Sequence, residues 1–302
     1  MTFTQLEIFA VVAELGSFTA AGQRLAITQS AVSHALKQLE TEWGVTLLSR
    51  GPTGIEVTEV GKSLLLRVRE LLGVSEAIRQ EVAAVRGLNR GVLRIGSFGT
   101  TSSLQLLPQI LEQFKRNCPE IDVFVDEGED DEVSQWLIER RVDVGFVVLP
   151  DERFDTVPLV EDQFVALIPV AHPLAAKKAV SLSAVCAVPF IMTLAGSAAA
   201  IQRLFEQERL HPTVKQRYAQ IITIIKMVES GSGVSIVADL AAPDQIMALC
   251  PGVVKKPLTP WVKRSVGLAV LKREHASPAV EALLKVARSV AISLRQTRSQ
   301  TR

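Results

Sequence analysis

The spacing of apolar residues divides the chain into a helical N-terminal part and a longer part that alternates strands with helices. Within residues 17–40, apolar side chains recur at intervals of three and four, which predicts two short helices. Ser17 and Thr28 precede these helices and can cap their first turns. Ile27 and Thr28 form the turn between them. The pattern indicates either a helix-turn-helix or a plain pair of antiparallel helices.

The second helix of this pair has one apolar face and one polar face. Its apolar residues are Ala31, Val32, Ala35, Leu36 and Leu39. The other face carries Gln29, Ser30, Ser33, His34, Lys37 and Gln38, all of which can donate hydrogen bonds, and none is a carboxylate. In a helix-turn-helix such a face enters the DNA major groove and contacts base edges. A helix pair with a solvated face is the alternative that this pattern alone leaves open.

Two further elements flank the helix pair. The sequence Thr4-Gln5-Leu6-Glu7 has the spacing of a capping box and predicts the start of a helix. After the pair, Arg50-Gly51-Pro52-Thr53-Gly54 lies between short apolar runs and predicts two strands joined by a turn. Residues 1–57 therefore read as an all-α winged helix-turn-helix domain.

A long helix is predicted from Thr58, as its cap, to about Arg86. Every third or fourth position along it is apolar or small, over four heptads: Val57, Gly61, Leu64, Val68, Leu71, Ser75, Ile78, Val82 and Val85. Such a seam predicts a coiled coil, and a coiled coil requires a partner helix. The alternative is a single amphipathic helix that lies on its own domain.

Residues 87–91 break this helix, and the remaining chain alternates strands and helices. The order of the elements predicts two α/β lobes, with the chain crossing between them near 159–163 and 260–266. Two crossings produce a hinged cleft like that of periplasmic binding proteins. We therefore expect a linker helix at 58–86, a hinge at 87–91 and an effector domain at 92–302, with lobe 1 at 92–161 and 266–302 and lobe 2 at 162–265.

Several segments together resemble the LysR-type transcriptional regulators. In the N-terminal domain they are Ala20–Ala21, Leu25, the run TQSAVS at 28–33, Leu39-Glu40, Arg50, Thr58 and Gly61. In the effector domain they are AHPLA at 171–175 and VESGSGV at 228–234. The resemblance covers essentially the whole chain. It implies a cytoplasmic, ligand-responsive DNA-binding protein that forms a homodimer or homotetramer, with RNA polymerase as a further candidate partner.

The same resemblance suggests roles in DNA binding beyond the helix pair. The wing of this family lies along the DNA backbone and minor groove, so Arg50 and Thr53 become candidates for phosphate contacts. An internal ion pair is the alternative for Arg50. Paired subunits favour an inverted-repeat operator. Together with Thr28 at the turn, the predicted DNA-binding set is Thr28, Gln29, Ser30, Ser33, His34, Lys37, Gln38, Arg50 and Thr53.

Net charge adds little to the DNA prediction. The chain carries a formal net charge of +1, and its first 88 residues contain eight Lys and Arg against nine Glu. A strongly basic domain would attract DNA phosphates regardless of sequence, and this domain is not one. The prediction therefore depends on where a few side chains are placed.

An effector is expected at the carboxyl ends of the strands, where small and hydroxyl residues precede helices. Thr100, Thr101 and Ser102 follow the first strand and suit an anion, with ordinary helix capping as the alternative. In the facing lobe the candidates are Thr193, Ser197 and Ile221, and the resemblance adds Glu129 and Val147. These loops contain no Arg or Lys, so a strongly charged effector has no evident counter-ion. The effector remains unidentified at this stage.

The remaining features argue against other classes. The motifs GxSxG, GxxxxGK[ST] and HExxH are missing, so we predict no enzyme, no cofactor and no metal site, with a solute-binding protein or cleft enzyme as the rival. We interpret the acidic run EGEDDE at 127–132 as the start of a helix, with a cation site as the alternative. Cys118, Cys186 and Cys250 stand alone and read as inert thiols, or else as a redox sensor. Residues 179–202 are uncharged but too interrupted for a membrane span.

Overall fold

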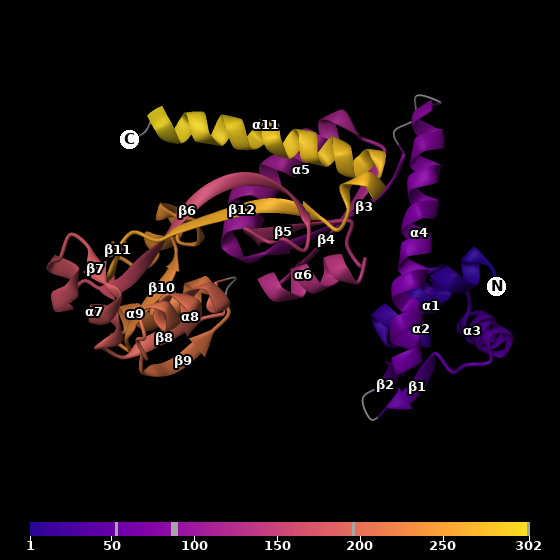
Figure 1. Ribbon diagram of the computed structural model, residues 1–302, viewed down its shortest axis with the longest axis horizontal. Helices are drawn as coiled ribbons and strands as arrows, with labels where there is room; N and C mark the ends of the chain where they lie inside the picture. The colour runs from indigo at the N-terminus through magenta and orange to yellow at the C-terminus, as the bar shows by residue number, and fades with distance from the viewer. Residues whose placement is uncertain (52–53, 86–89, 195–196, 301–302) are drawn as a thin grey trace.

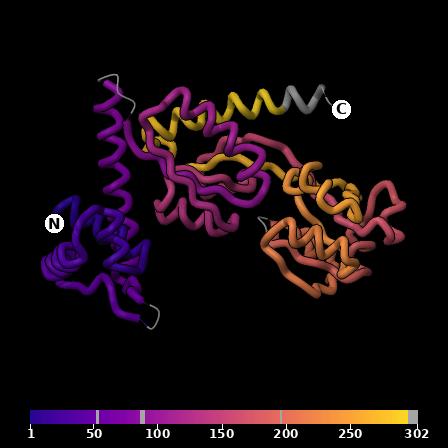
Figure 2. Tube along the Cα trace, turned by 180° about the vertical axis from the view of Figure 1, so that it is seen from behind, coloured from indigo at the N-terminus to yellow at the C-terminus, as the bar shows by residue number. Residues whose placement is uncertain are grey.

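The protein is described by a computed structural model that covers residues 1–51, 54–85, 90–194 and 197–300. A small helical domain packs around the lower part of one long helix, α4, and two α/β lobes follow (Figure 1). Lobe 1 lies beside α4, and lobe 2 lies at the far end of the molecule, which the view from behind shows as well (Figure 2). The N-terminal helical domain and lobe 2 are thus at opposite ends of the molecule, with lobe 1 between them.

The N-terminal domain is a three-helix unit with a two-stranded wing. Its elements are α1 (Phe3–Leu15), α2 (Phe18–Arg24), α3 (Gln29–Trp43), β1 (Leu48–Gly51) and β2 (Gly54–Val57). The strands pair antiparallel, with Arg50 opposite Ile55. The two predicted caps are confirmed, because Ser17 accepts from the Ala20 N–H at 3.3 Å and Thr28 from the Ala31 N–H at 3.1 Å.

The capping box of the first helix was placed two residues too late. Thr2, not Thr4, is the N-cap, and its hydroxyl accepts from the Gln5 N–H at 3.2 Å. The Gln5 side chain returns the bond to the Thr2 N–H at 2.8 Å. Gln satisfies the third helical position as well as Glu does, so the sequence offered two boxes, and the earlier one adds one half-turn of helix.

Helix α4 (Glu59–Val85) begins at its predicted cap, where the Gly61 N–H donates to the Thr58 hydroxyl at 2.9 Å. Its two halves have different surroundings. In the first half, Leu65 and Val68 are buried against the N-terminal core. In the second half, Ile78 and Val82 are exposed by 55% and 50%. The first half therefore lies on its own domain, whereas the exposed apolar residues of the second half form an open stripe.

The two lobes share one sheet through a continuous strand, β6 (Asp155–Pro169). The strand order is β4-β3-β5-β12-β6-β10-β8-β9, and β11 also pairs with β6. In lobe 1, β6 pairs with β12 along residues 155–163, and in lobe 2 it pairs with β10 along 164–167. The predicted crossing near 159–163 therefore lies inside a single strand instead of a connecting loop.

Lobe 1 has helices on both faces of its sheet. Its elements are β3 (Gly91–Phe98), β4 (Ile121–Gly128), β5 (Val144–Leu149), β12 (Lys263–Val270), α5 (Leu107–Asn117), α6 (Asp130–Ile138) and α11 (Pro278–Gln300). Helices α5 and α11 cover one face and α6 covers the other (Figure 1). A π-helical turn at Thr101–Leu106 leads directly into α5.

Lobe 2 repeats the layered arrangement on a smaller scale. Its elements are β7 (Val180–Ser181), β8 (Phe190–Thr193), β9 (Val214–Tyr218), β10 (Val234–Ala238), β11 (Val253–Thr259), α7 (Leu182–Cys186), α8 (Ala198–Gln207), α9 (Ile221–Glu229) and α10 (Asp244–Met247). Short 3₁₀ turns lie at Pro173–Ala176 and Asp239–Ala241, and a third at Arg273–His275 precedes α11 in lobe 1. Separate apolar cores form on the two faces of the sheet.

Candidate DNA interface and effector cleft

The polar face of α3 is fully open to solvent. Val32, Leu36 and Leu39 are buried in the N-terminal core. All seven predicted DNA-binding residues at this helix are exposed: Thr28, Gln29, Ser30, Ser33, His34, Lys37 and Gln38. The helix thus presents donors and no carboxylate along 29–38, which is the requirement for contact with base edges and phosphates.

Three of these side chains already form hydrogen bonds within the domain. The Thr28 hydroxyl caps α3 and also lies 3.0 Å from the Ser30 hydroxyl. The Gln38 side-chain oxygen accepts from Gln5 Nε2 at 3.4 Å. Lys37 forms no ion pair within the described part of the chain, so its charge remains free for an external partner.

The wing places Arg50 on β1, exposed to solvent. Across the described ranges, Arg50 has no ion pair, so the alternative of an internal partner finds no support. Thr53, the second wing candidate, lies outside the described residues.

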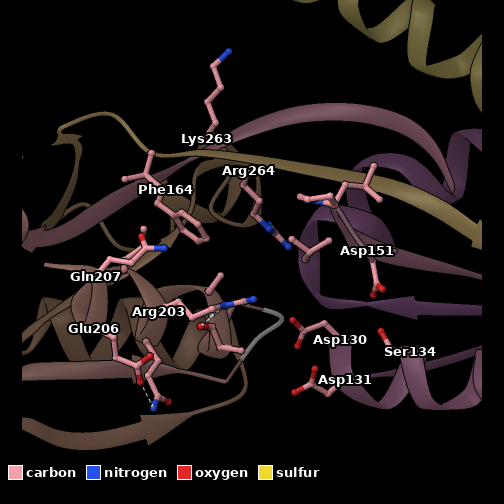
Figure 3. Close-up of a pocket in the computed structure, with 18 of the residues that line it drawn as sticks. Asp130, Asp131, Ser134, Asp151, Phe164, Arg203, Glu206, Gln207, Lys263 and Arg264 are labelled. Atoms are coloured by element: carbon pink, nitrogen blue, oxygen red, sulfur yellow. Dashed lines mark hydrogen bonds between the residues drawn. The ribbon is translucent and has the colours of Figure 1, made fainter. Parts of the chain in front are cut away.

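A cavity of about 1040 Å³ opens between the two lobes. Its lobe 1 wall includes Asp130, Asp131 and Ser134 of α6, and its lobe 2 wall is formed by α8 (Figure 3). Val262–Arg264, where the chain returns to lobe 1, line it between the two walls. A small molecule held here would touch both lobes at once.

The predicted effector residues do not coincide with the described lining of this cavity. Most of them are buried, namely Thr101, Ser102, Val147, Thr193, Ser197 and Ile221, whereas Thr100 is half-buried and Glu129 is exposed. None of the eight is among the described residues that line the cavity, but Asp130, Val148 and Ala199 beside them in sequence are. Their role in effector binding stays a prediction.

The hydroxyls of the 100–102 segment have different roles. Ser102 Oγ accepts from the Phe98 N–H at 3.1 Å and donates to the Phe98 carbonyl, so it closes the end of β3. This contact is local and structural, but it differs from the helix capping given as the alternative, since Thr100 at the helix start forms no side-chain cap bond. Thr101 Oγ1 accepts from Arg264 Nη1 at 3.4 Å. Thr101 therefore connects this segment to a cation that comes from the other end of the chain.

Arg264 and Asp162 are the charged residues that sequence reasoning missed. They are direct partners in the β12–β6 register, and Arg264 Nη1 lies 3.6 Å from Asp162 Oδ2. Only 3% and 2% of their side chains are exposed. Burial lowers the pKa of the Arg264 guanidinium and raises the pKa of the Asp162 carboxyl. The only signal in the sequence was a charged residue inside each of two apolar strands.

The other charges near the cavity are mostly paired or turned away. Arg153 Nε and Nη2 donate to the Asp151 carboxylate at 2.9 and 2.6 Å, which lowers the pKa of Asp151. Lys263 extends away from the cavity and lies over the Trp261 ring (Figure 3). Glu129 caps α6, so the acidic run is a helix start, and burial raises the pKa of Asp130.

The described residues contain no candidate metal site and no candidate membrane-spanning helix. Among them there is no group of three or more His, Cys, Asp or Glu side chains arranged to hold a metal ion. Their helices include none that is long and apolar enough to span a bilayer. Cys118 and Cys250 are buried and Cys186 is half-buried, and desolvation raises the pKa of the Cys118 thiol.

The fold and these two sites define a winged helix-turn-helix DNA-binding module joined to a two-lobed ligand-binding domain. Residues 3–62 match the family described as bacterial regulatory helix-turn-helix protein, lysR family, and residues 86–291 match the LysR substrate binding domain. The chain belongs to the LysR family of transcriptional regulators, whose members combine DNA binding with an effector-binding domain.

Relatives match along nearly the whole length. The chain is 35% identical to the HTH-type transcriptional regulator YvbU of Bacillus subtilis, over 96% of this chain and 99% of the relative. It is 36% identical to LrrA of Synechococcus elongatus, a probable HTH-type transcriptional regulator, over 98% and 100%. A full-length OxyR variant from Pseudomonas aeruginosa aligns with a TM-score of 0.75 at 25% identity, covering 96% of each chain.

Proposed function

We propose that this regulator binds an inverted-repeat operator through α3 and the wing, and that a small molecule in the interlobe cavity switches it. The exposed, carboxylate-free face of α3 is the observation that carries the DNA part. Gln29, Ser30 and Ser33 would contact base edges, while Lys37 and Arg50 would hold phosphates. For Thr53 we keep the predicted contact with the phosphate backbone of DNA.

Dimer formation follows from the exposed half of α4. Leu71, Ile78 and Val82 leave an apolar stripe that a second α4 would cover. Two subunits joined along it would present two α3 helices to successive major grooves, which explains the expected symmetry of the operator. Further assembly to a tetramer, and contact with RNA polymerase, belong to the same proposal.

The route from cavity to DNA would run along α6. This helix has Asp130 and Asp131 in the cavity wall at its first turn. At its other end, Glu139 accepts from Arg69 of α4 at 3.3 Å, and Arg140 donates to Glu70 of α4 at 3.0 Å. A ligand that favours one spacing of the lobes would shift α6 and hence α4, in addition to any movement at residues 87–91.

The same proposal also covers the cellular location of the protein and its lack of catalytic activity and cofactor. A protein that reads bacterial DNA works in the cytoplasm, where that DNA lies. The relatives named above are regulators, and we assign the chain no catalytic activity and no resident cofactor, only an effector. The rival, a solute-binding protein with a helical extension, would bind the ligand without binding duplex DNA.

A gel-shift titration with DNA from upstream of the gene tests this function. The wild-type chain should bind one site in the nanomolar range typical of specific regulators, about 10⁻⁸ M or tighter. The double variant Ser33→Ala with Lys37→Ala should lose most of this affinity, and Glu81→Ala, on exposed α4 surface, should keep it. Equal binding by the double variant would reject the assigned face, and no binding by the wild type would favour the rival.

A further inference from the structure

In the described part of the chain, the hydrogen bonds and ion pairs between α4 and lobe 1 lie at two levels of the helix. Near the end of α4, the Gln80 side chain donates to the Val92 carbonyl at 3.0 Å and accepts from the Ala279 N–H at 3.2 Å. One turn earlier, the Glu76 carboxylate accepts from the Val92 N–H at 3.0 Å. We call these contacts the inner junction. Gln80 is only 3% exposed, so breaking its bonds would leave buried groups without partners.

The second level lies earlier on α4, where the C-terminal end of α6 meets it (Figure 1). Arg69 donates to the Glu139 carboxylate at 3.3 Å, and Arg140 donates to the Glu70 carboxylate at 3.0 Å. We call these two contacts the outer ion pairs. Both carboxylates are 36% exposed, and Glu70 and Arg140 also line a cavity of about 330 Å³ between α4 and lobe 1. Water reaches these pairs, so opening them costs little free energy.

The N-terminal domain moves together with α4. Leu65 and Val68 of this helix are buried in the N-terminal core, so the first half of α4 belongs to that domain. The rise of an α-helix places the start of α4 about 30 Å from Gln80. A rotation of about 10° around Gln80 would therefore displace the start of the helix by roughly 5 Å. Such a rotation becomes possible when the outer ion pairs open and the inner junction stays closed.

The backbone at Arg140 is held in an unusual conformation. Its φ is 52°, in the left-handed region that residues other than glycine rarely adopt. Glu139 is the C-cap of α6, so Arg140 directly follows the helix end. Residues in such conformations cluster at switch regions, where the surrounding contacts maintain them. The ion pair with Glu70 is one contact that holds Arg140 in place.

We propose that the inner junction is a pivot and that the outer ion pairs are a latch, which sets the angle between the DNA-binding domain and lobe 1. This inference deepens the proposed function and rests on it. The first turn of α6 lines the interlobe cavity, and its C-terminal end carries the latch, so an effector that moves α6 opens or closes the latch. In a dimer, two such rotations change the spacing of the α3 helices relative to half-sites about 34–36 Å apart.

Hydrogen exchange on the full-length protein separates the latch from the pivot, because the N–H groups of Val92 and Ala279 are themselves donors in the inner junction. Arg140→Glu places a carboxylate opposite Glu70 and opens the latch. Exchange of the amides at 139–142 should rise by about 2- to 5-fold, as for the loss of a partly exposed ion pair. The amides of Val92 and Ala279 should exchange at the wild-type rate.

Two further variants control for the change of charge. Glu70→Arg combined with Arg140→Glu restores an ion pair of reversed polarity and should return the exchange at 139–142 toward the wild-type rate. Arg116→Glu makes the same charge change on α5, where Arg116 pairs only with Glu112 of its own helix among the described residues, and it should leave both levels unchanged. If Arg140→Glu does not fold, Arg140→Gln removes the charge without adding repulsion and should shift exchange in the same direction.

Operator DNA shows whether the latch acts on the DNA-binding domain. Upstream DNA fragments with the site at different positions report the bend angle of the complex through their gel mobility. Arg140→Glu should change the bend angle of the wild-type complex, the charge-swapped double variant should restore it, and Arg116→Glu should leave it as it is. The exchange measurements need no DNA, so they decide the pivot and latch even for a chain that binds none.

Each result therefore has one meaning. The inference is overturned if Val92 and Ala279 loosen together with 139–142, if 139–142 do not respond, or if the charge swap restores nothing. It is also overturned if Arg140→Glu bends the operator as the wild type does. If the wild type binds no upstream fragment, the proposed function fails, whatever the exchange at the two levels shows.

Discussion

The backbone N–H of Ala279, in the first turn of the C-terminal helix α11, donates a hydrogen bond of 3.2 Å to the side-chain oxygen of Gln80 on α4. The Gln80 amide nitrogen donates to the Val92 carbonyl at 3.0 Å, and Glu76 accepts from the Val92 N–H at 3.0 Å. One buried glutamine thus joins α4 to the first strand and the last helix of lobe 1.

Replacing this glutamine should destabilise the junction. Gln80→Leu removes the partners of the Ala279 N–H and the Val92 carbonyl inside a buried contact, and each unsatisfied buried group costs about 1–3 kcal/mol. We expect a clearly lower free energy of unfolding in urea, with operator affinity less affected. Glu81→Leu, one residue along and exposed, is the control. A Gln80→Leu protein as stable as the control would show that the bonds contribute little.

The charge of Lys37 should contribute to DNA affinity through a phosphate or a base. Lys37→Ala should weaken operator binding, and the slope of log affinity against log salt should fall by about one if the partner is a phosphate. Lys62→Ala is a matched control, since Lys62 is equally exposed but pairs with Glu59 on α4. Filter binding between 50 and 200 mM salt, approximately the range over which such slopes are measured, gives both quantities. Identical slopes for the two variants would remove Lys37 from the interface.

The exposed half of α4 should be the part that holds subunits together. Ile78→Lys with Val82→Lys places charges in the proposed seam, where each apolar side chain would otherwise contribute roughly 1.5–3 kcal/mol by burial. Sedimentation velocity should then show monomers. Leu64 is a poor choice for this test, because it packs on the N-terminal core and a charge there would disturb folding. Glu81→Lys, which changes the net charge as much as the two lysines of the seam variant but at an exposed position, controls for added charge, and an unchanged oligomer of the seam variant would refute the interface.

The fork between Arg153 and Asp151 predicts a small pH dependence of stability. The hydrogen bond from Arg153 holds the pKa of Asp151 below its ordinary value, so the folded state binds this proton more weakly than the unfolded state. The stabilisation is present above about pH 4, the unfolded pKa, and is lost as pH falls through the lower folded value.

Asp151→Asn removes that contribution. The free energy of unfolding should drop by less than about 1 kcal/mol near pH 7, because Arg153 is half exposed. The gap between wild type and variant should close at acidic pH. Urea titrations at pH 7 and pH 3.5 measure it, with Glu152→Gln as the exposed neighbour. A gap that widens toward acid would have the wrong sign for this fork.

Local patterns were sufficient for the elements of the N-terminal domain. The caps at Ser17, Thr28 and Thr58 lie within three residues of the N–H groups they accept from, so spacing in the chain determined them. The same reasoning misplaced the first cap, because two overlapping capping boxes are both chemically sound and only packing selects Thr2.

The effector cavity is formed by contacts between residues that lie far apart in the sequence, and such contacts could not be predicted from local patterns. Arg264 meets Thr101 across 163 positions, and no period or motif links them. The α4 seam shows the same limit, because Val68 and Ile78 belong to one heptad pattern but only Val68 is covered by the chain itself.

The sequence by itself determined the polar face of α3 and the two-lobed alternation, because helix and strand periodicity record which side of an element is buried. The LysR family was indicated by the resemblance of particular motifs, such as the run TQSAVS at 28–33. Tertiary structure alone decided where charge sits in the cavity and which half of α4 stays open. Those properties arise when strands distant in sequence are brought into register, and burial then changes the solvation of each ion. Gln80 illustrates this limit. It is a polar residue on a helix, and it is buried only because its side chain bonds to Val92 and Ala279 of lobe 1.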